Sequence, residues 1–169
     1  MGFREVKSEL FKLEKDVLIK HISELYKKHK AVKEYFDLII SPDESQMLEQ
    51  YKVKVTEGFF PKRGFQLKLS TSKKAINDFK KSGISQQSEA ELLLHFVENG
   101  VEFVNAYGDI DERFYTSLVN NFEKALELLA KNGLLDKYRE KALKIVDETT
   151  DMGWGVHEYL FELFHNYYG

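Results

Sequence analysis

Apolar residues recur along this chain mainly at spacings of three and four, which is the period of an α-helix with one buried face. The alternation typical of a strand is nearly absent. Its best candidate is Phe65-Gln66-Leu67-Lys68-Leu69, which we interpret as an extended linker because no partner strand is visible. The pattern predicts an all-α fold of eight or nine antiparallel helices. One irregular bundle and a short α-superhelix both remain open, because no convincing repeat is present.

The expected helices are separated by short segments that carry stop and start signals. Ser41, Pro42 and Glu44 form the strongest start signal, with Ser at the N-cap, Pro at the first helical position and Glu at the third. Ser70 or Thr71 is expected to cap the helix that follows the linker. The helices should cover about residues 3–12, 15–29, 31–40, 42–60, 71–82, 86–107, 112–131, 134–149 and 155–168.

Gly100 and Asp111 have specific roles predicted within and after the longest predicted helix. The helix 86–107 is expected to carry one apolar, inward face, formed by Leu93, Val97, Gly100, Val104 and Tyr107. Within it, Gly100 either permits close contact with another helix or marks a kink. Asp111 is expected to cap the next helix.

Composition narrows the class of protein. The 169 residues are 43% hydrophobic and 14% aromatic, which is enough for one sizeable core and predicts a single domain over residues 1–169. The absence of cysteine excludes disulfides and thiolate metal sites. The first residues lack the apolar stretch of a secretion signal, and no apolar run is long enough for a membrane span. We therefore expect a cytoplasmic protein.

Charge is distributed unevenly along the chain. Residues 52–81 contain nine Lys or Arg against two Asp or Glu, whereas residues 82–169 contain seven against sixteen. A basic region and an acidic region are therefore expected, and such asymmetry can steer a charged partner.

The basic segment 62–81 is the first candidate site, for nucleic acid. Its cations would neutralise phosphates while Phe65 stacks on a base. The competing interpretation, a solvated lysine-rich helix face with Phe65 in the core, is favoured because the whole chain has a net charge of −3 and carries no signature of a nucleic-acid-binding fold. The candidate residues are Lys62, Arg63, Phe65, Lys68, Lys73 and Lys74.

The second candidate is a metal site on the last helix. Glu158, Glu162 and His165 are four and three residues apart and so share a face, and the last two match the Glu-x-x-His spacing of di-iron bundles. Glu91 and His95 would be further ligands from the long helix. A second Glu-x-x-His motif is missing, so a solvated acidic face is favoured and no cofactor is expected.

Nucleophilic hydrolysis is the third candidate chemistry, and the sequence disfavours it. Ser70 and Ser88 are placed at expected helix caps, where serine makes local hydrogen bonds. A Gly-x-Ser-x-Gly elbow and the glycine-rich phosphate loops are absent.

The turn Gly153-Trp154-Gly155 is the most unusual local feature. Trp154 would serve either as an interface anchor or as a plug at the end of the core, and we favour the plug. Tyr167 and Tyr168 would either flank a groove, as part of an interface, or close the bundle. His157 is expected to hydrogen-bond nearby backbone.

Four segments in this order resemble a bacterial family of short helical proteins of unknown function that carries a Leu-Tyr-Lys motif. They are Leu25-Tyr26-Lys27, Val32-Lys33-Glu34-Tyr35-Phe36-Asp37, Phe59-Phe60-Pro61 and Gly153-Trp154-Gly155-Val156-His157. The resemblance implies a bacterial, cytoplasmic, all-helical protein, and it transfers no catalytic residue.

By elimination, the sequence favours a non-enzymatic binding or scaffold protein with a protein partner. Nucleic-acid binding through residues 62–81 and a metal-dependent enzyme are the alternatives.

Overall fold

The computed structural model describes residues 2–40, 44–64 and 66–169, in which every regular element is a helix, so the predicted all-α class is confirmed. The helices form two compact units, Met1–Pro42 and Asp43–Gly169, here the N-terminal and C-terminal units. The single domain predicted for residues 1–169 stays a prediction. None of the helices in the described ranges combines the length and apolarity needed to cross a membrane.

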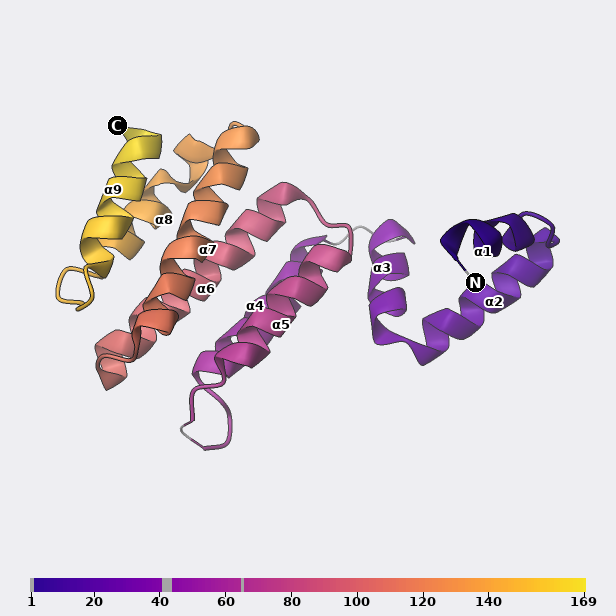
Figure 1. Cartoon of the computed structure of the whole chain (residues 1–169), viewed down its shortest axis with the longest axis horizontal. Coiled ribbons are helices and arrows are strands. Elements are labelled where there is room, and N and C mark those ends of the chain that lie inside the picture. Colours follow the sequence, from indigo (N-terminus) through magenta and orange to yellow (C-terminus); the bar gives the residue numbers. More distant parts are fainter. Residues whose placement is uncertain (1, 41–43, 65) are drawn as a thin grey trace. The chain divides into compact units, whose positions relative to one another are not determined.

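The N-terminal unit contains α1 (Phe3–Leu10), α2 (Lys15–Lys28) and α3 (Lys30–Ile40) (Figure 1). The helix α2 packs on α3, and neither α1 nor α2 contains a buried residue. α1 ends two residues earlier than predicted, because the amides of Lys12 and Leu13 bond to carbonyls three residues back and tighten the last turn.

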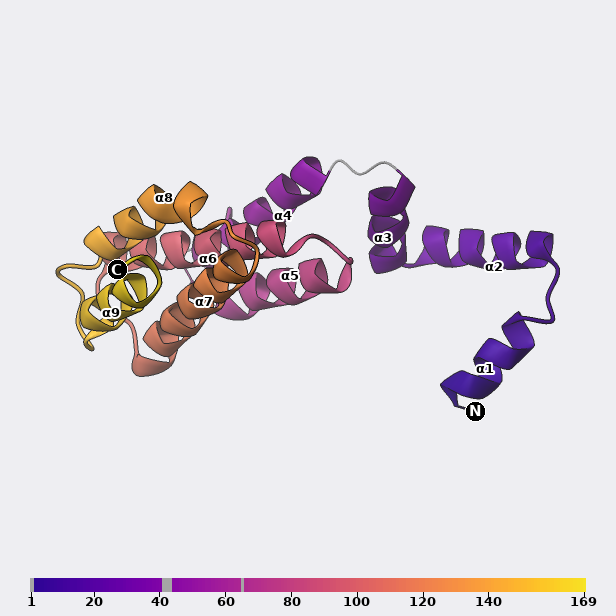
Figure 2. The same cartoon turned by 90° about the horizontal axis from the view of Figure 1, so that it is seen from above.

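The C-terminal unit is built so that neighbours in sequence are neighbours in space. Each helix packs on the next, and α6 also contacts α4 and α8, which places it at the centre of the unit (Figure 2). The result is an irregular antiparallel bundle. Its helices are α4 (Glu44–Phe59), α5 (Leu69–Lys81), α6 (Gln86–Tyr107), α7 (Glu112–Lys131), α8 (Leu135–Asp147) and α9 (Val156–Tyr168).

The core of the C-terminal unit is centred on α6. Phe96 of α6 is fully buried and meets Phe59 of α4 edge to face, with ring centroids 5.1 Å apart. A Cβ atom at Gly100 would stand 2.3 Å from Leu118 Cδ2, so Gly100 permits close packing of α6 on α7, and α6 runs unbroken past it. Tyr107 was expected on the same inward face, but it is 62% exposed at the last turn.

The helix caps agree with the sequence in part. Asp111 caps α7 as predicted, its carboxylate accepting from the amide of Phe114 at 2.8 Å. The start signal at Ser41 and Pro42 lies outside the described residues. The side chain of Ser85 caps α6.

Two cap predictions were wrong. α5 begins at Leu69, with Lys68 at the N-cap, so neither Ser70 nor Thr71 caps it. Ser88 lies inside the first turn of α6 and donates its amide to the side chain of Ser85. In both cases a hydroxyl residue stands near the start of the helix, and the period of the apolar residues does not decide which residue begins it.

Candidate functional site

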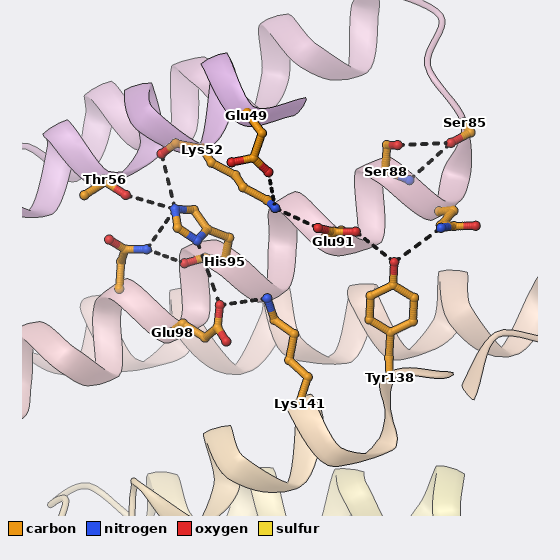
Figure 3. A network of polar contacts seen from close by, with 12 residues as sticks. Glu49, Lys52, Thr56, Ser85, Ser88, Glu91, His95, Glu98, Tyr138 and Lys141 are labelled. Carbon is orange, nitrogen blue, oxygen red and sulfur yellow. Dashed lines mark hydrogen bonds and ion pairs between the residues drawn. The ribbon is translucent and has the colours of Figure 1, made fainter. Parts of the chain in front are cut away.

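Polar residues of α6 form one stripe that faces α4 and α8 (Figure 3). Glu91, His95 and Asn99 are four residues apart and Glu98 is three residues after His95, so these residues lie on one side of the helix. The sequence had paired Glu91 with His95 as spare metal ligands, but here they contact other helices. We name the polar seam the set Lys52, Thr56, Glu91, His95, Glu98, Asn99, Tyr138 and Lys141.

Lys52 joins α4 to α6. Its Nζ lies 2.6 Å from Glu49 Oε1 and 2.7 Å from Glu91 Oε1, and 17% of the side chain is exposed. Burial alone would lower the pKa of Lys52, but hydrogen bonds to the two carboxylates raise it above its ordinary value. The ammonium is therefore charged at neutral pH and ties the two helices together.

Tyr138 joins α8 to the same carboxylate. Its hydroxyl donates to Glu91 Oε2 at 2.8 Å. Burial and the carboxylate raise the pKa of Tyr138 to about 12, so the hydroxyl stays protonated as a donor. Burial alone would raise the pKa of Glu91, but the hydrogen bonds from Lys52 and Tyr138 lower it overall.

Two turns further along α6, another ion pair joins this helix to α8. Lys141 Nζ lies 2.9 Å from Glu98 Oε2, with 29% of each side chain exposed. Burial alone would raise the pKa of Glu98, but His95 and Lys141 beside it lower the pKa below its ordinary value. Glu98 is therefore ionised at neutral pH.

The ring of His95 lies against α4. Its Nε2 is 2.9 Å from Thr56 Oγ1 and 3.2 Å from the carbonyl oxygen of Lys52. The side-chain amide of Asn99, which donates through its Nδ2, lies 3.1 Å from the same Nε2, so this nitrogen is in contact with both an acceptor and a donor of α4 and α6. The other ring nitrogen, Nδ1, is 3.8 Å from Glu98 Oε2, which is beyond hydrogen-bond distance.

Thr56, His95 and Glu98 follow the order of a hydroxyl, an imidazole and a carboxylate, as in hydrolases, but the roles differ. A general base must accept the proton of the nucleophile, and the carboxylate must orient the imidazole. Here Nε2 faces a backbone carbonyl, and Glu98 pairs with Lys141. The geometry therefore favours a clamp between helices over an activated nucleophile.

An open pocket of about 560 Å³ lies beside the polar seam. Two of its carboxylates already pair with lysines, Glu98 with Lys141 and Glu148 with Lys144. Its polar groups are thus largely satisfied by the protein itself. The lining residues are Thr56, His95, Glu98, Asn99, Glu102, Lys144 and Glu148.

The basic segment 62–81 is exposed, and two of its cations are paired. Lys80 Nζ lies 3.1 Å from Glu89 Oε1. Lys62 Nζ lies 2.7 Å from Glu57 Oε1. Phe65 lies outside the described residues. Nucleic-acid binding by this segment stays a prediction. The cations of the segment that are exposed and form no ion pair within the described ranges are Arg63, Lys68, Lys73, Lys74 and Lys81.

The residues proposed as metal ligands do not gather. In the part of the chain that the structure describes, no three His, Asp or Glu side chains lie close enough to hold a metal ion, so Glu158, Glu162 and His165 form no such group. Instead, His165 stacks on Phe161, with ring centroids 4.1 Å apart.

The second histidine of α9 has a local structural role. His157 Nδ1 lies 3.1 Å from Thr149 Oγ1 and 3.3 Å from the carbonyl oxygen of Val146, which agrees with the predicted hydrogen bonding to nearby backbone.

The three residues proposed for an interface have different positions. Trp154 is 59% exposed, so the favoured interpretation of a core plug was wrong. Tyr168 is not available to a partner, because it is buried and stacks on Phe164 at 4.6 Å. Tyr167 is half-buried and packs against the core.

The sequence also missed an exposed apolar surface in the N-terminal unit. Its helices show the expected stripes, but the structure leaves them uncovered. A small pocket of about 320 Å³, lined by Lys7 and four apolar residues, opens among them. We name the N-terminal apolar face the set Phe3, Val6, Leu10, Phe11, Leu13, Val17, Ile19, Ile22, Leu25, Tyr35 and Ile40, all at least 37% exposed.

Comparison with known proteins gives one match. The model of a family of unknown function (DUF6155) matches residues 1–168. No curated protein and no solved structure is significantly similar to the chain.

Proposed function

The chain belongs to this family of unknown function, and we propose that it is a non-enzymatic scaffold protein whose N-terminal apolar face docks on the same face of a second copy. The observation that carries the proposal is the exposure of that face: its large apolar side chains are 37–81% exposed, and α1 and α2 contain no buried residue.

The exposed apolar side chains of this set together have the area of one side of a stable interface, although they are spread around the helices, with Val17 and Ile19 two residues apart on α2. At roughly 200 Å² for a fully exposed large apolar residue, the exposed fractions amount to roughly 1,000 Å². Each partner in an interface of standard size buries about 800 Å². Exposed apolar patches of more than a few hundred Å² mark interaction sites in soluble proteins.

The charges around the face favour a second copy over a strongly charged partner. Residues 1–40 contain nine Lys or Arg and seven Asp or Glu, interspersed along the helices. Several are already matched within a helix, such as Lys28 with Glu24 and Lys33 with Asp37. A nearly neutral rim of both signs meets its own copy without net repulsion, as a self-complementary two-fold interface requires.

The C-terminal unit supplies the other half of a scaffold, a rigid body. The polar seam ties α4, α6 and α8 together around a closely packed core. Because its charges are matched to one another, the seam supports a structural role better than a catalytic one.

Sedimentation equilibrium of the full chain tests the proposal. We expect a monomer–dimer equilibrium at micromolar concentration. Ile22→Lys, which places a charge in the N-terminal apolar face, should weaken association by roughly tenfold or more. The matched control is Leu143→Lys on α8, since Leu143 is 41% exposed and Ile22 is 40% exposed. A monomer at every concentration, or equal loss in both variants, would contradict the proposal.

Nucleic-acid binding is a second candidate, supported by the exposed and unpaired cations around the start of α5. Lys73 and Lys74 lie on α5, and Arg63 and Lys68 precede it. If this segment binds phosphates, affinity for mixed-sequence single-stranded DNA should fall steeply with salt and drop in the double variant Lys73→Gln, Lys74→Gln. Absence of binding at low salt would remove this candidate.

A further inference from the structure

A separate aromatic pocket lies in the C-terminal unit, between the first turns of α7 and α9. Its volume is about 300 Å³, which is the lower end of the range for small-ligand sites. We name it the Trp154 pocket. It is lined by Glu112, Tyr115, Thr116, Val119, Asn120, Trp154, Val156 and Tyr159.

Two aromatic rings of this pocket are presented to solvent. Trp154 and Tyr159 are each 59% exposed, whereas Tyr115 and Val156 are buried beneath them. The floor is fixed, because the Tyr115 hydroxyl donates to the carboxylate of Asp109. The pocket thus combines a rigid base with aromatic walls that a ligand can cover.

The backbone that presents Trp154 is strained. Trp154 has φ +62°, the only positive φ of a residue other than glycine in the described ranges. Bulky residues rarely adopt this conformation. The turn has little freedom to relax, because a Cβ atom at Gly153 would stand 2.9 Å from Asp109 Oδ2. Strain at an exposed aromatic residue that burial does not explain is typical of functional positions.

The charge around the pocket is negative. Glu112 is the only ionisable side chain of Asp, Glu, Lys, Arg or His type in the described lining. Asp109 lies beneath Tyr115, and Glu158 Oε2 is 3.8 Å from where a Cβ on Gly155 would stand. Asp111 caps α7 at the same end.

The positive charge near the pocket is smaller than the negative charge of the carboxylates. Arg113 adjoins Glu112 in sequence, and the N-termini of α7 and α9 contribute about half a positive charge each. Four carboxylates outweigh these two positive charges.

From this geometry we infer that the Trp154 pocket binds an organic cation, the ammonium or guanidinium side chain of a Lys or Arg on a partner protein. Aromatic faces attract such cations, and Trp is the most favourable ring. The carboxylate of Glu112 in the lining disfavours anionic groups and completes the recognition. Because the pocket lies within the C-terminal unit, the inference holds whether or not the N-terminal apolar face associates.

The chain carries its own probe for this inference. Trp154 is the single tryptophan of the sequence, so intrinsic tryptophan fluorescence reports on the pocket alone. The full chain is titrated with N-acetyl-lysine methylamide and N-acetyl-arginine methylamide. N-acetyl-norleucine methylamide is the neutral control of similar shape. We expect a saturable emission change with the two cations and none with the neutral compound.

A pair of variants separates the pocket from general charge. Glu112→Gln should raise the half-saturating concentration roughly fivefold, because it removes the rim carboxylate. Glu123→Gln, on an exposed position of the same helix, should leave the half-saturating concentration unchanged. Both variants keep Trp154 and are first shown by circular dichroism to be folded.

Three results would overturn the inference. They are the absence of saturation with either cation, an equal response to the norleucine compound, and a Glu112→Gln variant that binds like the wild type.

Discussion

The two units differ in how far their apolar residues are buried. In the C-terminal unit the stripes of α4 to α9 meet in one core that runs from Leu48 to Tyr168. In the N-terminal unit the stripes of α1 and α2 are as regular, yet none of their residues is buried. The comparison teaches that helical periodicity identifies an apolar face of a helix but does not show whether the same unit buries that face.

The difference has an energetic consequence. Helices shorter than about 12–15 residues are marginal in water unless tertiary packing supports them. α1 has 8 residues and α3 has 11, so packing must supply most of their stability. The C-terminal unit has that packing within itself, and we propose that a second copy supplies it to the N-terminal unit.

The largest expected effect contrasts two phenylalanines. Phe96 is fully buried, so Phe96→Ala should lower the free energy of unfolding of the C-terminal unit by about 4 kcal/mol. Phe3 is 81% exposed, so Phe3→Ala should change this free energy by less than about 0.5 kcal/mol. Urea unfolding followed by far-UV circular dichroism measures both. Similar losses in the two variants would remove the contrast between the units.

Two glycines make the next comparison. A Cβ atom at Gly58 would stand 2.0 Å from Ser72 Oγ and 2.9 Å from Ser72 N, where α4 meets α5. Gly58→Ala should therefore cost about 2 kcal/mol through overpacking. The control is Gly2→Ala in the N-terminal unit, which has no atom within 4 Å and should have almost no effect on the same unfolding curve. A Gly58→Ala variant as stable as wild type would show that the contact between α4 and α5 is loose.

The polar seam predicts a pH effect confined to the C-terminal unit. The pKa values of Glu91 and Glu98 are lowered in the folded state, so both carboxylates stabilise the fold above their ordinary pKa of 4.5. This contribution is lost as the pH falls through the lowered values. Glu91→Gln should cost about 1 kcal/mol at pH 7 and should reduce the loss of stability on acidification.

The control for the Glu91→Gln variant of the polar seam is a glutamate of the N-terminal unit. Glu24 forms an exposed pair with Lys28, so Glu24→Gln should leave both the stability and its pH dependence unchanged. If Glu24→Gln and Glu91→Gln have the same pH profile, the seam does not hold the helices together.

The smallest expected effect is a gain in stability. Glycine adopts the positive φ of position 154 without strain, and Trp154 is 59% exposed, so little burial is lost on its removal. Trp154→Gly should stabilise the C-terminal unit by up to about 1 kcal/mol, whereas Trp154→Ala should not. Thermal unfolding of the two variants tests this prediction. If Trp154→Gly unfolds at a lower temperature than Trp154→Ala, the backbone at position 154 is not strained.

The positions of the helices and most of their buried faces could be predicted from the sequence alone. The range of α6 was predicted without error, and Leu93, Val97 and Val104 are buried as expected. These residues follow a period of 3.6 over six turns, and Ser85 and Gly108 bound the helix, so local signals and packing agree. The same reasoning wrongly predicted that Tyr107 is buried, because periodicity does not show where a neighbouring helix ends.

The candidate sites were harder to predict from the sequence. The polar seam joins residues up to 47 positions apart in sequence, as in the bond between Glu91 and Tyr138, and one sequence contains no signal for such pairs. Glu91 and His95 were noted only for their mutual spacing. Trp154 was placed in the core because most tryptophans are, whereas it is 59% exposed in a turn where its φ is +62°, which the sequence does not reveal.

Amide hydrogen exchange of the full chain at several concentrations tests the central claim most directly. The account predicts that residues 3–40 exchange fast in dilute solution and become protected as the chain associates. Amides in the helices of residues 44–168 should exchange slowly throughout. Slow exchange of residues 3–40 at the lowest concentration would show that the N-terminal unit is stable alone. Fast exchange at every concentration would show that no second copy covers it, and either result would contradict the account.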